Sequence, residues 1–282
     1  MSKIDKFYEA KNLFQCPKCK KKIRFHAGGL VCKKEHTFDI AAKGYVNLLQ
    51  QTKAFKGYDG DFFQSRRRFF AAGYYDHLVN ETVATVSRLF PEGEELVVLD
   101  AGCGEGGYSL AVEKSLADEG KAAQILAFDI ASDAIKVAAG NDNVKWMIAD
   151  ITNIPVKDSV VDVILDVFTP ANYKEFNRVL KDGGYLIKVV PGSDHLKELR
   201  RAVSDQLQNK EYSNEEVTDY FEGHYELVSR VKLTQTMEIG GQALDDLVRM
   251  TPLLFDVDKK KLDLNGVTEI TIEGEVLVGQ KK

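Results

Sequence analysis

Residues 97–108 read VVLDAGCGEGGY and join an apolar run to a stretch with helical spacing. The apolar run is long enough for one buried strand, and the glycines after it allow a tight turn. Gly102 and Gly104 carry no Cβ atom, so the backbone there can approach a bound ligand closely. A glycine-rich turn between a strand and a helix is typical of nucleotide-binding sheets. We therefore expect a ligand site at the end of this strand.

Strand-like and helix-like stretches alternate from residue 94 onward. The expected strands lie at residues 96–100, 124–129, 144–149, 160–167 and 184–190, and the expected helices at 107–117, 132–139, 173–180 and 193–208. This alternation predicts a doubly wound, mostly parallel α/β sheet. Two β-rich runs, at residues 226–236 and 268–278, flank a helical stretch near 242–250. They predict a final antiparallel pair of strands, as in Rossmann-like methyltransferases.

The glycine loop alone is compatible with two cofactors. Gly102, Gly104 and Gly107 satisfy the G-x-G-x-x-G pattern of dinucleotide sites. Asp100 precedes the glycines, and its carboxylate would attract the ammonium and sulfonium groups of S-adenosylmethionine but repel a pyrophosphate. The loop, which includes Gly106, therefore favours S-adenosylmethionine, and a dinucleotide is the alternative.

Two further acids stand at the ends of the next two expected strands. Asp129 occurs in AFDI, where a carboxylate can accept both ribose hydroxyls, and Asp150 occurs in IADI, where it can accept the adenine amino group. Three acids at successive strand ends, together with the glycine loop, predict a Rossmann-like S-adenosylmethionine-dependent methyltransferase.

Four potential metal ligands lie close together near the N-terminus. Cys16 and Cys19 form a C-x₂-C pair, and Cys32 and His36 form a C-x₃-H pair. Two such pairs joined by a short hairpin suit tetrahedral zinc, and Gly28-Gly29 would supply the hairpin turn. Because all four ligands come from the protein, we predict one structural zinc ion per chain. Residues 1–45 are too few to form a sufficient apolar core, so this segment needs a bound metal ion to fold.

The net charge of −5 conceals an asymmetric distribution. Residues 1–70 hold 16 Lys and Arg against 6 Asp and Glu, whereas the remainder is acidic. A basic module on an acidic body is expected when one part binds phosphate and another performs chemistry. Basic and aromatic residues alternate around the cysteines, which suits RNA. The residues expected to contact RNA here are Lys18, Lys20, Lys21, Lys22 and Arg24. A solvated lysine-rich surface is the alternative.

The domain organisation is expected to have three parts. Residues 1–45 form the zinc-binding module for RNA recognition, residues 46–93 a helical connector with helices at 65–72 and 77–90, and residues 94–282 the methyltransferase domain. The apolar runs are strand-sized, and residues 1–11 are polar rather than of signal-peptide type. A cytoplasmic location is therefore expected.

Over nearly its whole length the chain resembles the bacterial 23S (large-subunit) ribosomal RNA guanine-N1 methyltransferases. The matching stretches are Cys16-Pro-x-Cys19, Cys32-x₃-His36, TFDIAAKGYVNLL at 37–49, Arg66-Arg67 with Ala72-Gly-Tyr-Tyr75, DAGCGEG at 100–106, Pro191-Gly192 with His195-Leu196, and Met250-Thr-Pro252. The resemblance implies methylation of a guanine in a domain II hairpin near the macrolide-binding exit tunnel. It leaves open which of two neighbouring guanines is the target.

The resemblance also implies roles for individual residues. Tyr75, Gly104, Glu105 and His195 would line the cofactor pocket. Arg66 and Arg67 would contact RNA, and two copies of the chain would form a homodimer whose zinc modules flank an RNA cleft.

Guanine N1 carries a proton, so the enzyme must assist its loss. Asp166, near the end of the strand expected at 160–167, is the candidate base. A helix cap, or a hydrogen bond to the guanine edge, is the alternative role. The segment 166–170 departs from the family pattern, so this role rests on position in the fold alone.

Two other functions compete with this interpretation. One is a small-molecule methyltransferase with an appended zinc domain, which the basic N-terminal segment disfavours. The other is a non-catalytic RNA-binding protein with a degenerate methyltransferase fold, which the intact glycine loop and acids disfavour.

Overall fold

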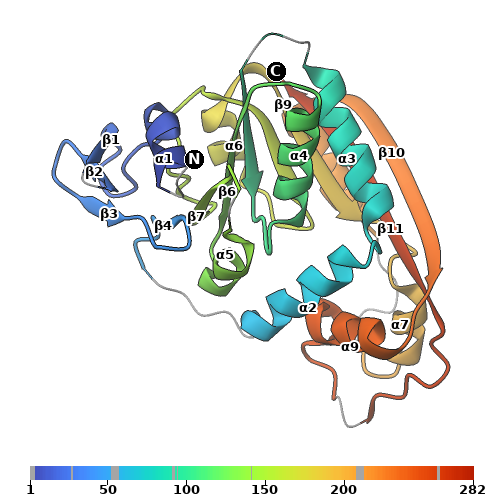
Figure 1. Cartoon of the computed structure of the whole chain (residues 1–282). Coiled ribbons are helices and arrows are strands. Elements are labelled where there is room, and N and C mark those ends of the chain that lie inside the picture. The colour runs from blue at the N-terminus through green and yellow to red at the C-terminus, as the bar shows by residue number, and fades with distance from the viewer. Residues whose placement is uncertain are drawn as a thin grey trace.

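A computed structural model describes residues 4–26, 28–51, 57–90, 93, 95–140, 142–207, 213–258 and 261–282. At its centre lies an eight-stranded sheet of order β10-β11-β9-β8-β5-β6-β7-β4 (Figure 1). Its strands are β4 (Tyr45–Asn47), β5 (Leu96–Ala101), β6 (Ala123–Asp129), β7 (Lys145–Ile148), β8 (Val161–Val167), β9 (Leu180–Pro191), β10 (Tyr225–Glu238) and β11 (Glu269–Lys281). Strands β4 to β9 pair in parallel, and β11 pairs antiparallel with both β9 and β10. The expected α/β class is confirmed.

Helices cover both faces of the sheet, which is why its central strands are almost wholly apolar. One face packs against α3 (Asp76–Leu89), α4 (Gly107–Asp118) and α5 (Ser132–Ala138). The other packs against α6 (Tyr173–Val179), α8 (Glu215–His224) and the N-terminal module. Beyond the carboxyl ends of the strands lie α2 (Gly60–Ala71), α7 (Lys197–Ala202), α9 (Gly241–Met250) and the short 3-10 helix η2 (Pro252–Leu254) (Figure 1). This end of the sheet is where ligands bind in such folds.

The observed elements differ from the expected ones at several places, among them the following. Helix α2 begins at Gly60, because the side chain of Asp59 accepts a hydrogen bond from the Phe62 N–H at 2.9 Å and caps the first turn. The helix expected at 193–208 is confined to α7, and its last residue lies outside the described residues. Helix α8 was not expected. The break expected at 91–93 falls outside the described residues except for Gly93.

The N-terminal module is a small antiparallel sheet of β1 (Ile23–His26), β2 (Gly29–Cys32) and β3 (Thr37–Asp39), preceded by α1 (Asp5–Glu9) and the short 3-10 helix η1 (Ala10–Asn12). Its buried residues Phe7 and Phe14 belong to the same apolar cluster as Leu99 and Met147 of the large sheet. Strand β4 also joins the edge of that sheet beside β7. The division at residues 45 and 93 stays a prediction, but the zinc module and the sheet share one core.

None of the helices within the described ranges is long and apolar enough to cross a membrane.

Candidate active site and zinc site

The four predicted zinc ligands come together in the N-terminal module. The ligand atoms of Cys16, Cys19, Cys32 and His36 all lie within 4.8 Å of one another. The Cys19 and Cys32 Sγ atoms are 3.7 Å apart, and Cys16 Sγ lies 3.4 Å from His36 Nδ1. These separations match the edges of a zinc tetrahedron with bonds of about 2.0–2.3 Å. The donor set therefore fits one structural zinc ion.

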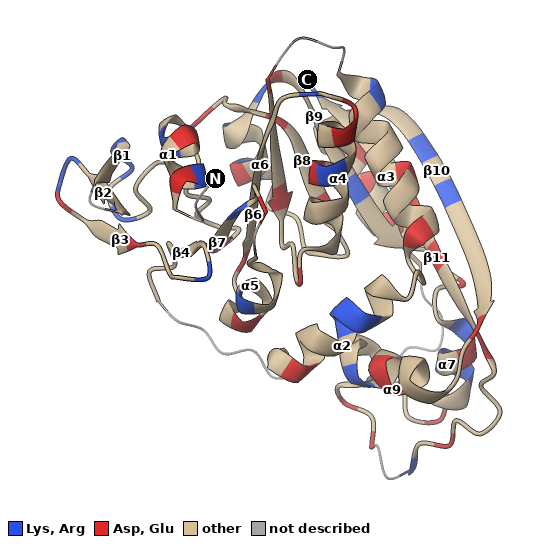
Figure 2. Ribbon diagram, in the orientation of Figure 1, with Lys and Arg blue, Asp and Glu red and all other residues tan. Residues whose placement is uncertain are grey.

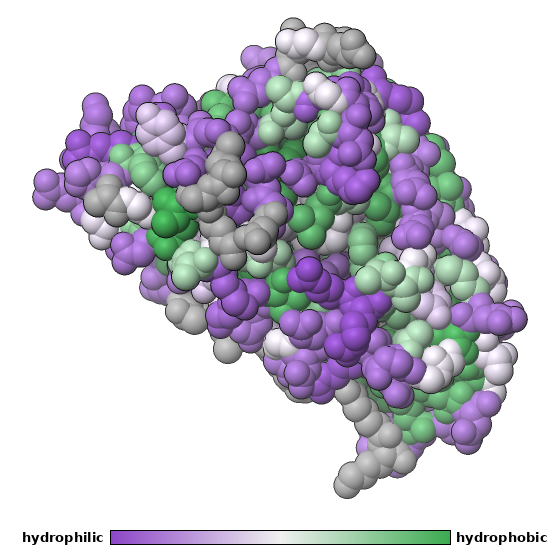
Figure 3. Space-filling view, in the orientation of Figure 1, coloured by the Kyte–Doolittle hydropathy of each residue, from purple (hydrophilic) through white to green (hydrophobic). Residues whose placement is uncertain are grey.

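The hairpin between the two ligand pairs is built largely as expected. Gly28 lies in the turn with φ +79, a conformation that favours glycine, whereas Gly29 is already the first residue of β2. The surrounding residues Lys18, Lys20, Lys21, Lys22 and Arg24 are all exposed. Figure 3 shows the outer surface of this module as largely hydrophilic.

The glycine loop between β5 and α4 is packed tightly against its surroundings at Gly102, Gly106 and Gly107. A Cβ atom on Gly102, which has φ +76, would lie 2.5 Å from Thr169 Oγ1, and one on Gly106 would lie 2.4 Å from the Trp146 ring. The Gly104 N–H donates to Asp129 Oδ2 at 3.0 Å. Side chains larger than glycine would clash at these three positions, and the loop backbone lines a cavity at the carboxyl end of the sheet.

A cavity of about 370 Å³ lies over this loop. Its lining includes Gly102, Gly104 and Asp129, together with Ala149 and Ile151, which follow β7. The Asp129 carboxylate also accepts from the Ala131 N–H at 2.8 Å, and burial raises the pKa of Asp129. A cradle of bare backbone beside a carboxylate fits the adenosine part of S-adenosylmethionine.

The other two acids occupy different places. Asp100 is buried behind the loop, where it accepts from Ser109 Oγ at 2.5 Å, and burial raises its pKa to about 7. It lies outside the lining of this cavity, so in the structure it supports the junction of loop and helix. Asp150 lines a separate depression of about 190 Å³ with residues 48–51 and Asn153. For both, cofactor contact stays a prediction.

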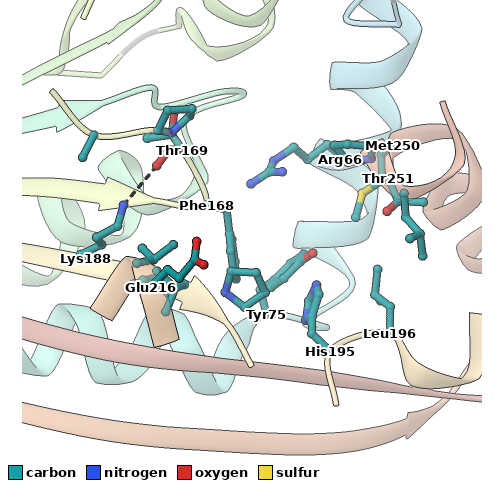
Figure 4. Close-up of a pocket in the computed structure, with 18 of the residues that line it drawn as sticks. Arg66, Tyr75, Phe168, Thr169, Lys188, His195, Leu196, Glu216, Met250 and Thr251 are labelled. Carbon is teal, nitrogen blue, oxygen red and sulfur yellow. Dashed lines mark hydrogen bonds between the residues drawn. The ribbon is translucent and has the colours of Figure 1, made fainter. Parts of the chain in front are cut away.

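A second cavity of about 880 Å³ adjoins the first (Figure 4). Both cavities are lined by Arg66, by Phe168-Thr169-Pro170 and by Pro252, so these residues form a shared wall. Tyr75 and His195, expected in the cofactor pocket, line the larger cavity. Two adjoining cavities allow a donor and an acceptor to meet at one wall.

The two arginines expected to contact RNA lie in different environments. Arg66 is mostly buried in the shared wall, with its Nε 2.6 Å from Glu105 Oε2, and Glu105 is itself 4% exposed. Arg67 is exposed and donates to the Val137 carbonyl oxygen at the end of α5. Figure 2 shows the basic residues of α2. The structure thus places Arg66 beside the ligand cavities, because its ion pair with Glu105 draws the guanidinium inward, and RNA contact by either arginine stays a prediction.

Phe168 holds the centre of the shared wall in a strained conformation. Its φ is +53, which is unfavourable for a residue with a Cβ atom. Its ring stacks on His195 with centroids 5.6 Å apart and lies 5.9 Å from the Tyr75 ring. Burial lowers the pKa of His195 to about 4, and its Nδ1 accepts from the Glu273 N–H at 3.3 Å. The imidazole is therefore neutral at pH 7, with its proton on Nε2.

Asp166, the candidate base, is fully buried and lies outside the lining of both cavities. Its Oδ2 is 2.7 Å from Lys188 Nζ. Burial raises the pKa of Asp166 to about 6 despite that partner. Successive side chains of a strand point to opposite faces, and it is Val167 that faces the smaller cavity. In the structure Asp166 therefore holds Lys188, and direct proton transfer from guanine to Asp166 stays a prediction.

The comparisons with known proteins agree with this arrangement. Residues 92–244 match the family model described as a methyltransferase domain, and residues 14–54 match the model of the RlmA N-terminal zinc ribbon. The chain is 34% identical over 278 residues to YxjB of Bacillus subtilis (strain 168), named as a 23S rRNA (guanine-N(1)-)-methyltransferase; the match covers 96% of this chain and 98% of that protein. The chain belongs to this methyltransferase family.

Two further similarities extend the comparison. The 23S rRNA (guanine(748)-N(1))-methyltransferase of Streptomyces fradiae is 29% identical over 265 residues, which cover 92% of this chain and 93% of that enzyme. A chain in the complex between the Haloferax volcanii Trm112 methyltransferase activator and a methyltransferase matches with TM-score 0.52 at 14% identity, covering 81% and 99% of the two chains. The latter shows the fold alone. The protein is an S-adenosylmethionine-dependent methyltransferase with a zinc ribbon.

Sequence reasoning missed three charged residues that line the larger cavity, namely Lys188, Arg200 and Glu216. Lys188 is a lone charge within the apolar strand GYLIKVV, a signal that could have marked it. Glu216 lies on α8, where only a connection was expected. Nothing in its local sequence indicates that it reaches a cavity.

Replacing Asp129 with alanine should weaken S-adenosylmethionine binding by about 1–3 kcal/mol, because hydrogen bonds to a charged acceptor are lost. The Gly104 N–H also loses its partner. Isothermal titration calorimetry measures the change. Asp133→Ala on the neighbouring helix, where Asp133 pairs with Lys136, is the matched control and should bind normally. Equal affinities of the two variants, or tighter binding of NAD than of S-adenosylmethionine by the parent, would contradict the assignment.

Proposed function

We propose that this chain transfers a methyl group to N1 of a guanine in 23S rRNA. The observation that carries the proposal is the pair of cavities joined at Phe168. The smaller one has the glycine loop and Asp129 of a cofactor site, and the larger one has room for an extruded nucleobase. The substrate, 23S rRNA, and the methylated atom, guanine N1, are inferred from the names of its relatives in Bacillus and Streptomyces.

The shared wall suits the positioning that methyl transfer requires. The bound cofactor supplies a methyl group that is open to in-line attack. Phe168, backed by His195 and Tyr75, offers a rigid aromatic surface against which a purine can stack. The strained backbone of Phe168 keeps that surface at the boundary between the cavities. Holding the base about 3–3.5 Å from its reaction partner supplies much of the rate.

The proposal extends to the finer features implied by the family resemblance. The target lies in a domain II hairpin near the macrolide-binding tunnel, and the enzyme acts in the cytoplasm. Two copies associate, with their zinc modules flanking the RNA. Sedimentation of the purified protein measures the last feature, and a monomer at micromolar concentration would contradict it.

Transfer of label from tritiated S-adenosylmethionine tests the function. Protein-free rRNA, whole ribosomes and a metabolite extract are offered in parallel, and the labelled nucleoside is identified by mass spectrometry. We expect 1-methylguanosine in the rRNA. Label confined to metabolites would instead indicate a small-molecule enzyme. Cofactor binding without any transfer would indicate a binding protein.

Replacing Lys20, Lys21 and Lys22 together with glutamine should weaken RNA binding and flatten its salt dependence. Each lost contact to single-stranded phosphate lowers the slope of log Kd against log salt by about 0.7, because fewer counterions are released. Lys20 also donates to Asn153 Oδ1, so its side chain is partly held in place. Lys114→Gln, an exposed lysine on α4 paired with Asp118, is the control. Identical slopes for the triple variant and the parent would mean that these lysines lie outside the RNA surface.

A further inference from the structure

The larger cavity contains one carboxylate among the described residues that line it, that of Glu216. Figure 4 shows this side chain pointing from α8 into the space that Lys188 and Phe168 also face. Asp166, Asp100 and Glu105 are buried away from the cavity in ion pairs or hydrogen bonds. Glu216 is exposed, so its carboxylate is in contact with water as well as with the cavity.

The other titratable groups of the cavity are unsuited to accept a proton. His195 has a pKa of about 4, and its Nδ1 already accepts a hydrogen bond. Burial raises the pKa of the Tyr75 and Tyr173 hydroxyls, so both stay protonated at neutral pH. The rest are basic side chains or exposed phenol, namely Arg66, Lys188, Arg200 and Tyr220.

Lys188 complements Glu216 across the cavity. Asp166 Oδ2 and the Thr169 carbonyl oxygen, at 2.7 and 3.2 Å from Nζ, hold the ammonium group in place. The Watson–Crick edge of guanine presents an acceptor at O6 beside a donor at N1. The Lys188 ammonium can donate to O6, and the Glu216 carboxylate can accept from N1. Adenine presents the reverse order, a donor at N6 and an acceptor at N1, and would meet both groups unfavourably.

We propose that Glu216 contacts the target guanine and accepts its N1 proton, while Lys188 donates to O6. This inference rests on the proposed function. The N1–H bond breaks and its proton passes to the Glu216 carboxylate. The N1 electron pair forms the new bond to the methyl carbon, and the pair of the broken carbon–sulfur bond stays on sulfur. Negative charge that develops on O6 is stabilised by Lys188. The exposed Glu216 then returns its proton to water.

Glu216→Gln tests the inference because glutamine keeps the shape of the side chain but cannot take a proton. The control is Glu215→Gln, an exposed neighbour on α8 outside the cavity lining. Single-turnover methylation of the rRNA hairpin should slow by about 10²–10⁴-fold at pH 7 in Glu216→Gln alone. The parent rate should level off as pH rises, whereas the Gln variant should continue to rise with hydroxide. Glu216→Asp should recover part of the rate.

A binding measurement without cofactor gives an independent readout. The parent should bind the hairpin with guanine at the target more tightly than one with adenine there, and Glu216→Gln should reduce that preference at least fivefold. Affinity of Glu216→Gln for S-adenosylmethionine should equal that of the parent. A rate within threefold of the parent together with an unchanged pH profile would overturn the role of Glu216 and leave the proposed function standing. A parent that leaves guanine N1 unmethylated would overturn both.

Discussion

Replacing Lys188 with methionine is expected to lower the free energy of unfolding by about 3–5 kcal/mol at pH 8. The change leaves the Asp166 carboxylate fully buried without its cationic partner, and breaking a buried ion pair by removing one member costs that much. Methionine has nearly the same length as the lysine stem, so the lost charge rather than a cavity accounts for the effect. Urea unfolding measures it.

The loss of unfolding free energy in Lys188→Met should be smaller at pH 5 than at pH 8. The folded pKa of Asp166 is about 6, above its ordinary value of 3.8, so the folded state binds the proton more tightly than the unfolded state. The contribution of Asp166 to the free energy of unfolding therefore falls as pH rises from about 4 through 6. Without Lys188 the folded pKa rises further, and the penalty continues to grow above pH 6. At pH 5 the carboxyl is protonated and needs no partner.

A matched ion pair on the same two strands serves as the control. Lys181 of β9 lies 2.7 Å from Asp162 of β8, but its side chain is 44% exposed. Lys181→Met should therefore cost no more than about 1 kcal/mol. Equal losses for the two lysine variants, or an equal loss for Lys188→Met at both pH values, would contradict the buried-pair argument.

Cys32→Ser is expected to remove zinc and unfold the N-terminal module. In isolated zinc modules metal binding supplies about 10–16 kcal/mol of apparent folding free energy, and here the three strands β1 to β3 depend on it. Because Phe7 and Phe14 of that module pack on the large sheet, we expect the whole protein to lose about 3–5 kcal/mol, seen as a thermal midpoint lower by roughly 10 °C.

Metal content, thermal unfolding and cofactor titration together test this prediction. Zinc should be absent from Cys32→Ser, while S-adenosylmethionine affinity below the unfolding transition should be close to that of the parent, since the glycine loop lies on another part of the sheet. Cys103→Ser, in that loop and outside the metal cluster, should retain a full zinc ion. Full zinc content in Cys32→Ser would refute the ligand assignment.

Much of the fold and both ligand sites were predictable because their signals are local. The spacing of Cys16, Cys19, Cys32 and His36 reflects the reach of a tight turn, and their four ligand atoms do come together. The glycine loop likewise follows from the conformational freedom of glycine, and the positive φ of Gly102 and Gly104 agrees. The spacing of apolar residues indicates which faces of the strands and helices are buried. This pattern was enough to predict the parallel sheet and its antiparallel end.

The sequence alone determined the zinc ligands, the glycine loop and the α/β class, since each depends on residues close together in the chain. The tertiary structure decided which charges face a ligand. Asp166 points into the core because of its register on β8, and Arg66 turns inward because Glu105 is there to pair with it. Lys188 and Glu216 line one cavity because the N-terminus of α8 lies beside the end of β9, where the Asn214 side chain donates to the Pro191 carbonyl oxygen. Which distant residues come together depends on sheet order and helix docking. Packing over the whole chain sets both, so the local sequence carries no signal of them.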